Sequence, residues 1–322
     1  MLFEKLTAPR LLIEAELRPI QGSRFQPTGF PGLGAATYRG SSGEEMLLVE
    51  SVQSMANRME SVCWDPVGDD LIHLLKGVPY IRVFNPQGLF LTASPLEAHR
   101  MNSPYIMEAH TADHTPFLDV VKSRLEATAV TLPTVSELAA LLAYYDLNSL
   151  IHGVFFAQKS LYGGRLRIPR ILSGFVEAQD VRVAMSGGVK LDQVDPKGDS
   201  ATGRGHVPFS REEFTAAKMT AYFNLDLMEI RGFRLSPYLN DLLLTLSLFK
   251  IREVLARGLR FRTACDLDLV SLRVTQPAGF ELPDLPILEE MVPQLIEAAA
   301  ATGALQDPAV TPLTYHKATK ES

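Results

Sequence analysis

The chain has 322 residues, of which 46% are hydrophobic and 21% are charged. This balance is typical of a globular protein that buries a large core, and it excludes disorder over most of the length. The net charge of −6 and the sequence pI of 5.7 argue, over the whole chain, against a protein that binds nucleic acid through its overall charge.

The N-terminal third predicts a strand, a loop, a helix and a hairpin. Apolar and charged residues alternate over 11–20, which indicates a half-buried strand. The Gly- and Pro-rich segment 21–40 predicts a long loop. Ser42 and Glu45 have the spacing of a capping box, so we expect an amphipathic helix over 43–60. The segments 80–84 and 89–92 flank the turn sequence NPQG and predict a hairpin.

The rest of the chain alternates helical and extended patterns. We expect a helical insertion at 94–147, in which Thr134 and Glu137 form a second capping box. Ser210 and Glu213 have the same spacing and predict the start of another helix. The further predicted elements are strands at 149–157, 171–185 and 263–275, a Gly-rich projection or long hairpin at 186–209, and helices at 238–257 and 285–302.

This order predicts one elaborated α+β domain over 1–322, with a modified ferredoxin-like, RNA-recognition-type antiparallel sheet. The segment 281–322 is expected to form an acidic C-terminal helix and tail.

The cysteines and the apolar runs of the sequence indicate the cellular compartment in which we expect the protein. Cys63 and Cys265 cannot build a disulfide framework and lack metal-ligand spacing, which indicates a reducing cytosol. The longest apolar run, 242–249, is shorter than the roughly 20 residues of a membrane span, so we expect a buried helix there. The N-terminus does not resemble a secretory signal, and we expect a cytoplasmic protein that does not bind membranes.

Charge is distributed unevenly along the chain. Six basic residues face two acidic ones between positions 159 and 190, and five face one between 250 and 262. From position 281 onward the chain carries seven acids and two lysines. The basic segments are therefore candidates for binding an anionic polymer.

Four separated segments, QGSRFQPTGFP, LVESVQSMANRME, SLIHGVFF and RIPRILSGFVEA, resemble the backbone subunit of type I-G (formerly I-U) CRISPR Cascade complexes, in the RAMP superfamily. The resemblance implies a non-catalytic subunit without cofactors that polymerises head-to-tail along a CRISPR RNA. It also implies contact with further copies of itself, with other Cascade subunits and, in the assembled complex, with target DNA. The glycine-rich loop that the superfamily carries near its C-terminus is not evident here.

Such a subunit must hold guides of any sequence and leave their base edges free, so contacts to phosphate are expected to dominate. The loop residues Gln21, Ser23, Arg24 and Gln26 suit this role. A basic patch formed by Lys159, Arg165, Arg167 and Arg170 is the strongest candidate, with a solvated loop as the alternative.

Weaker candidates are Gln53, Asn57 and Arg58 on the polar side of an early helix, where a solvated face is equally compatible. His152 is either an RNA contact or a structural histidine. Tyr162 is a candidate for stacking on a base.

The family also inserts a hairpin called a thumb, which separates the guide into short segments and touches the neighbouring subunit. Residues 186–209 are the candidate thumb, and the connection 158–170 is a rival. Lys190, Lys197 and Arg204 would supply charge, and Val189, Leu191 or Val194 would wedge between nucleotides.

Two other functions remain open at this point. His110, Asp113 and His114 have a spacing that could hold a metal in a hydrolase, with His73 and His99 as further ligands, although the Glu of an HExxH motif is missing. A structural subunit that binds only protein would explain the acidic net charge.

Overall fold

The computed structural model describes residues 2–30, 32, 34–128, 132–202 and 204–316. Small parts of the predicted N-terminal loop, helical insertion and projecting segment, and the end of the predicted tail at 317–322, lie outside the described residues.

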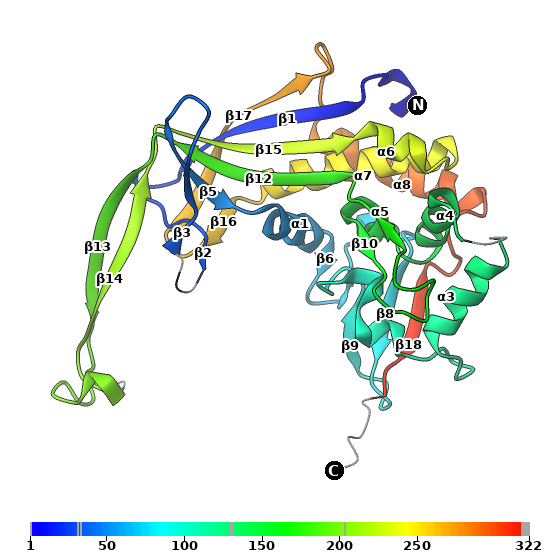
Figure 1. The fold of residues 1–322 in the computed structure, drawn as a ribbon, viewed down its shortest axis with the longest axis horizontal. Helices are drawn as coiled ribbons and strands as arrows, with labels where there is room; N and C mark the ends of the chain where they lie inside the picture. Colours follow the sequence, from blue (N-terminus) through cyan, green and yellow to red (C-terminus); the bar gives the residue numbers. More distant parts are fainter. Residues whose placement is uncertain (1, 31, 33, 129–131, 203, 317–322) are drawn as a thin grey trace.

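A seven-stranded antiparallel sheet forms the centre of the fold, in the order β16-β17-β1-β15-β12-β5-β4. Buried and solvent-facing side chains alternate along β1 and give the sheet one face toward the core. Ile13, Ala15 and Leu17 are buried, whereas the intervening Glu16 is exposed. Figure 1 shows the long strands β1, β15 and β12 side by side above α1. The strands are β1 (Arg10–Pro19), β4 (Thr37–Arg39), β5 (Glu45–Glu50), β12 (Leu172–Gln179), β15 (Lys218–Asp226), β16 (Leu259–Arg262) and β17 (Cys265–Gln276).

Helix α1 (Val52–Ser61) packs against strand β12 of this sheet and against α7 (Pro237–Ala256), and α7 packs against α8 (Leu285–Ala301). Ser236 caps α7 by accepting a hydrogen bond from the Leu239 N–H at 3.3 Å. Most of α7 is buried around its whole circumference, including the predicted apolar run. The short helices η1 (Phe3–Lys5) and α6 (Leu227–Gly232) lie near its N-terminal end.

A second group of elements is built around the three-stranded sheet β18-β8-β9 (Val310–Thr314, Tyr80–Phe84, Phe90–Ala93), in which β18 runs parallel to β8. Figure 1 shows helices α3, α4 and α5 beside this sheet. The remaining elements are η2 (His73–Leu75), η3 (Arg100–Asn102), α2 (Pro104–Met107), α3 (Phe117–Glu126), α4 (Val135–Tyr145), α5 (Leu147–His152), β10 (Val154–Phe155), β11 (Arg167–Ile168), and the small pairs β2 (Gly29–Phe30) with β3 (Gly34–Ala35) and β6 (Trp64–Asp65) with β7 (Asp70–Leu71).

A long hairpin, formed by β13 (Arg182–Lys190) and β14 (Val207–Thr215), extends away from the rest of the molecule (Figure 1). Its tip contains the short helix η4 (Ser200–Thr202). Most of its side chains are exposed, so this ribbon contributes little to the core.

The α+β class, the antiparallel sheet, the helical insertion and the projecting hairpin are confirmed. Strand β1, hairpin β8–β9, helices α7 and α8 and the capping box at Thr134 and Glu137 also agree with the predictions. Both cysteines are buried and unpaired, as expected.

Four predicted elements are wrong. The single strand predicted at 171–185 divides into β12 and β13, which belong to different sheets and are separated by residues 180 and 181. Residues 45–50 form strand β5, which pairs with β12 and β4, and the helix begins only after Ser51, whose hydroxyl accepts from the Ser54 N–H at 3.2 Å. The predicted strand 149–157 begins as the end of helix α5, which stops at His152 before Gly153 at φ +79°, and only Val154 and Phe155 form a strand. Ser210 and Glu213 lie in strand β14, where ladder pairing with Gly187 and Ala184 outweighs the local capping signal.

The C-terminal segment, predicted as a helix and tail, also contains strand β18. Within the part of the chain that the structure describes, no helix has the length and apolar character needed to cross a membrane.

Candidate nucleic-acid interface

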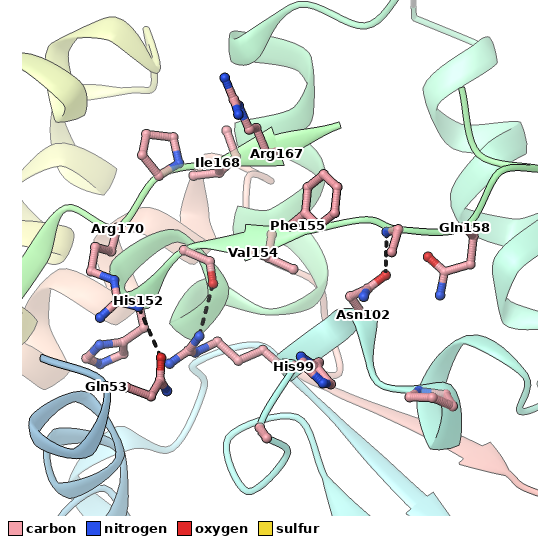
Figure 2. Close-up of a pocket in the computed structure, with 16 residues that line it drawn as sticks. Gln53, His99, Asn102, His152, Val154, Phe155, Gln158, Arg167, Ile168 and Arg170 are labelled. Atoms are coloured by element: carbon pink, nitrogen blue, oxygen red, sulfur yellow. Dashed lines mark hydrogen bonds between the residues drawn. The ribbon is translucent and has the colours of Figure 1, made fainter. Parts of the chain in front are cut away.

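An open groove with a volume of about 1100 Å³ lies between the start of α1, the segment 98–104 and the hairpin β10–β11 (Figure 2). It is lined by Gln53, Ala98, His99, Arg100, Asn102, Pro104, His152, Gly153, Val154, Phe155, Ala157, Gln158, Arg167, Ile168, Pro169 and Arg170. Segments from three separate parts of the chain therefore form one concave surface.

The hairpin β10–β11 places an aromatic ring beside a guanidinium on the wall of this groove. Val154 pairs with Ile168 and Phe155 pairs with Arg167. Val154 and Ile168 are buried, whereas Phe155 and Arg167 are exposed. The backbone at Gly153 passes close to the backbone at Arg170. Only glycine fits there, because a Cβ atom at position 153 would lie 2.8 Å from the backbone nitrogen of Arg170.

Arg170 closes one end of the groove. Its guanidinium donates to the carbonyl oxygen of Val52 at 3.4 Å and to Oε1 of Gln53 at 3.2 Å (Figure 2 draws the second bond). Both acceptors are neutral, and no carboxylate of a described residue lies within ion-pair distance. Burial, and then the positive charge of Arg100, lower the pKa of Arg170 from its ordinary value. This end of the groove is therefore electropositive.

A buried polar network forms the floor beneath Arg170. Glu60 and Arg100 are each 5% exposed. Glu60 Oε1 accepts from Arg100 Nε at 2.6 Å and from Asn148 Nδ2 at 2.6 Å, and its Oε2 accepts from Arg100 Nη2 at 2.8 Å. Lys250 Nζ donates to Asn148 Oδ1 at 2.5 Å and lies 2.9 Å from His152 Nε2. One carboxylate is thus surrounded by several cationic groups.

His152 is part of this floor rather than of an exposed surface. Its side chain is 1% exposed, and its Nδ1 atom has no hydrogen-bond partner in the described structure. Burial lowers the pKa of His152 well below its ordinary value, and the charges of Lys250, Arg100 and Arg170 lower it further, so the ring is neutral.

The predicted basic patch is divided between the groove and the loop above it. Arg167 and Arg170 line the groove, while Lys159 and Arg165 are exposed in the connection between β10 and β11. Tyr162 in the same loop is half-buried against the core.

The candidates on α1 differ from one another. Gln53 lines the groove, and its amide donates to Oδ1 of the exposed Asn57 at 3.0 Å. Arg58 instead contacts Glu50 Oε1 at 2.7 Å and the carbonyl oxygen of Phe261 at 2.6 Å. Since its donors are occupied within the protein, Arg58 ties α1 to β5 and β16.

The loop candidates lie away from the groove, at the base of the hairpin β13–β14, because the buried Phe25 bridges to Phe214 on β14. Gln21, Ser23 and Arg24 are exposed, and Arg24 pairs with Glu213 at 3.3 Å. Gln26 is half-buried, and its backbone N–H donates to the carbonyl oxygen of Ala264 at 2.8 Å.

The remaining candidates lie on the hairpin. Lys190, Lys197 and Arg204 are exposed along the hairpin and its tip. The proposed wedge residues Val189, Leu191 and Val194 are also exposed, Val194 to 96%.

The predicted metal site is not assembled. His110 precedes a turn rather than lying on a helix, and the helix α3 begins at Phe117. The Asp113 carboxylate accepts from the backbone N–H of Thr115 at 3.5 Å, and His114 has φ +64°. Among the described residues, no group of three His, Cys, Asp or Glu side chains could hold a metal ion.

Sequence reasoning missed Phe155, Arg100 and Gln158 in the groove. Phe155 lies in one of the quoted segments, and its neighbour Phe156 is buried, so alternation in VFF could have indicated its exposure. Arg100 carries no local signal, because its partner Glu60 lies 40 positions away.

The family model described as "CRISPR-associated protein GSU0053 (Cas_GSU0053)" matches residues 11–183. No curated protein sequence matches the chain significantly. Two solved structures are distantly similar. One is a "CRISPR RNA-guided surveillance complex, pre-nicking", at 13% identity, over 91% of this chain and 86% of that chain, with a TM-score of 0.44. The other is Csc2 from Thermofilum pendens, at 12% identity, over 91% of this chain and 77% of that chain, with a TM-score of 0.32.

Proposed function

Because the chain belongs to the CRISPR-associated protein GSU0053 family, whose model covers more than half of it, we propose that it is a non-catalytic subunit that binds a CRISPR guide RNA along its sugar-phosphate backbone. The family membership confirms that the four segments of the sequence pointed to a CRISPR-associated protein. Guide binding in the cytoplasm, with other Cascade subunits as partners and target DNA in the assembled complex, is part of this proposal.

The observation that carries the proposal is the electropositive groove around Arg170. A half-buried guanidinium without a described acidic partner is costly unless an anion approaches it. Arg167 adds an exposed guanidinium to the half-buried one of Arg170, and Arg165 and Lys159 add charge in the loop above. A polymer of phosphates suits this arrangement, since each phosphate can accept two bonds from a guanidinium fork.

Sequence independence follows from the kind of contact. Phosphate contacts position a nucleic acid without reading its bases, so one groove can hold guides of any sequence. The acidic net charge of the chain is compatible with this because the basic residues are concentrated locally.

The hairpin β13–β14 supports assembly into a filament along the guide. It projects from the sheet and exposes Val189, Leu191 and Val194 together with Lys190, Lys197 and Arg204. A projection that fits a different patch on the next copy makes a heterologous contact, which generates open filaments. We therefore assign the thumb role to this hairpin in preference to the connection 158–170, which forms the wall of the groove.

Charge reversal tests the groove. The variant Arg165→Glu/Arg167→Glu/Arg170→Glu should lose affinity about equally for unrelated RNA sequences, because phosphate contacts carry no sequence information. The slope of log affinity against log salt should fall by about 0.7 for each lost contact, or roughly 2 in total. Filter binding or fluorescence anisotropy over a salt series measures both quantities.

A matched control is Lys5→Glu/Lys76→Glu/Arg234→Glu, which changes net charge equally at exposed positions outside the groove. The double variant Arg165→Glu/Arg167→Glu leaves the hydrogen bonds of Arg170 to α1 intact. A loss of RNA affinity in this variant therefore reflects lost contacts to RNA rather than a disturbed fold. Wild-type affinity in the groove variants would refute the proposal. Absence of RNA binding by the wild-type chain at low salt would favour the subunit that binds only protein.

A further inference from the structure

Phe155 is an unusual feature of the groove wall. Its side chain is 53% exposed, although the residues before and after it, Val154 and Phe156, are buried. The ring faces the groove beside Arg167, its cross-strand partner (Figure 2). An exposed aromatic ring next to a guanidinium, inside a concave surface, is a typical platform for an unpaired base.

Polar side chains lie at both ends of the groove, on either side of this ring. Arg170 lies at one end and Gln158 at the other (Figure 2). The guanidinium of Arg170 offers donors, which suit phosphate oxygens, and the amide side chain of Gln158 can form hydrogen bonds with a ribose or a base.

We propose that the groove holds a nucleotide of single-stranded RNA, with its base stacked on Phe155 and its phosphate toward Arg167 and Arg170. This inference rests on the proposed function and extends it, because it assigns a base contact to a chain otherwise expected to contact only the backbone. The stacked face of a phenyl ring reads no base edge, so the platform accepts any base and keeps the binding independent of sequence.

The orientation of the nucleotide follows from the hairpin register. Since Phe155 and Arg167 are direct partners on neighbouring strands, a base lying on the ring leaves its own phosphate within reach of that guanidinium. Arg170 is three residues further along the same chain segment, at the closed end of the groove.

Phe155→Ala tests the platform with two probes of equal length: an oligouridylate, and an abasic ribose-phosphate oligomer that keeps the phosphates and lacks the bases. The variant should bind the oligouridylate about 5- to 150-fold more weakly than wild type, the range for losing one stacked base. Its affinity for the abasic oligomer should be unchanged. Phe155→Trp should retain oligouridylate binding and show a quenched indole emission on binding, since the natural Trp64 is buried.

Tyr238→Ala is the control, because Tyr238 is an exposed aromatic residue outside the groove. If wild type binds oligouridylate and Phe155→Ala binds it equally well, the stacking inference is overturned while the proposed function stands. If Phe155→Ala impairs only the assembly of copies, as seen by size-exclusion chromatography, Phe155 is a protein contact and the inference is likewise overturned. If wild type binds neither probe at low salt, both proposals fail.

Discussion

The buried ion pair between Glu60 and Arg100 offers a quantitative test of the groove floor. Glu60 accepts three hydrogen bonds at 2.6–2.8 Å, two from Arg100 and one from Asn148. Glu60→Gln would remove the only negative partner of Arg100 among its described ion pairs and leave a guanidinium that is 5% exposed near Lys250 and Arg170. The change keeps the size of the side chain, so the effect comes from charge and hydrogen bonding.

Breaking a buried pair in this way costs about 3–5 kcal/mol in the free energy of unfolding, because one charge remains buried without compensation. For a chain of 322 residues, this corresponds to a fall in Tm of about 4–7 °C. Arg100→Met should destabilise the protein similarly. The double variant should lose less than the sum of the two, because neither charge is then left without its partner.

Urea unfolding and differential scanning calorimetry of the four proteins give the double-mutant cycle. Glu14→Gln is the matched control, since it breaks the exposed pair between Glu14 and Arg273, where the expected loss is about 0–1 kcal/mol. The reasoning is refuted if Glu60→Gln lowers Tm no further than Glu14→Gln does.

Two further predictions concern the hairpin and a buried acid. Deleting 186–209 together with Ser210→Asn and Arg211→Gly joins the paired residues Met185 and Glu212 by a two-residue turn. The Tm of this deletion variant should change by less than about 2 °C, since little apolar surface is lost. The discrete complexes that the protein forms on RNAs of stepped length should disappear in sizing experiments. Retained complexes would contradict the thumb assignment. Burial raises the pKa of Asp146 to about 6, so between roughly pH 4 and 6 the folded chain holds a proton that the unfolded chain has released, and stability falls as pH rises through this window. The free energy of unfolding of Asp146→Asn, measured relative to wild type, should therefore rise by roughly 2.5 kcal/mol from about pH 4 to pH 8, and a flat difference would show that the carboxyl group is not buried.

The sequence by itself determined the elements whose signals are local. Alternation over 11–20 fixed strand β1, the NPQG turn fixed the hairpin β8–β9, and the paired Thr134 and Glu137 fixed the start of α4. The glycine content of 186–209 indicated a segment outside the core. Each of these signals acts through neighbours a few residues apart, so it can be read without knowing the fold.

Tertiary structure decided the elements and contacts whose partners are distant in sequence. Residues 45–50 are a strand because β12, more than 120 positions away, pairs with them, although the Ser42 and Glu45 spacing favours a helix. The groove likewise combines Gln53, Arg100 and Phe155 from three separate segments. The basic patch could be found in the sequence because its residues are close together, but its position beside Phe155 and above a buried ion pair depends on packing that no local pattern records.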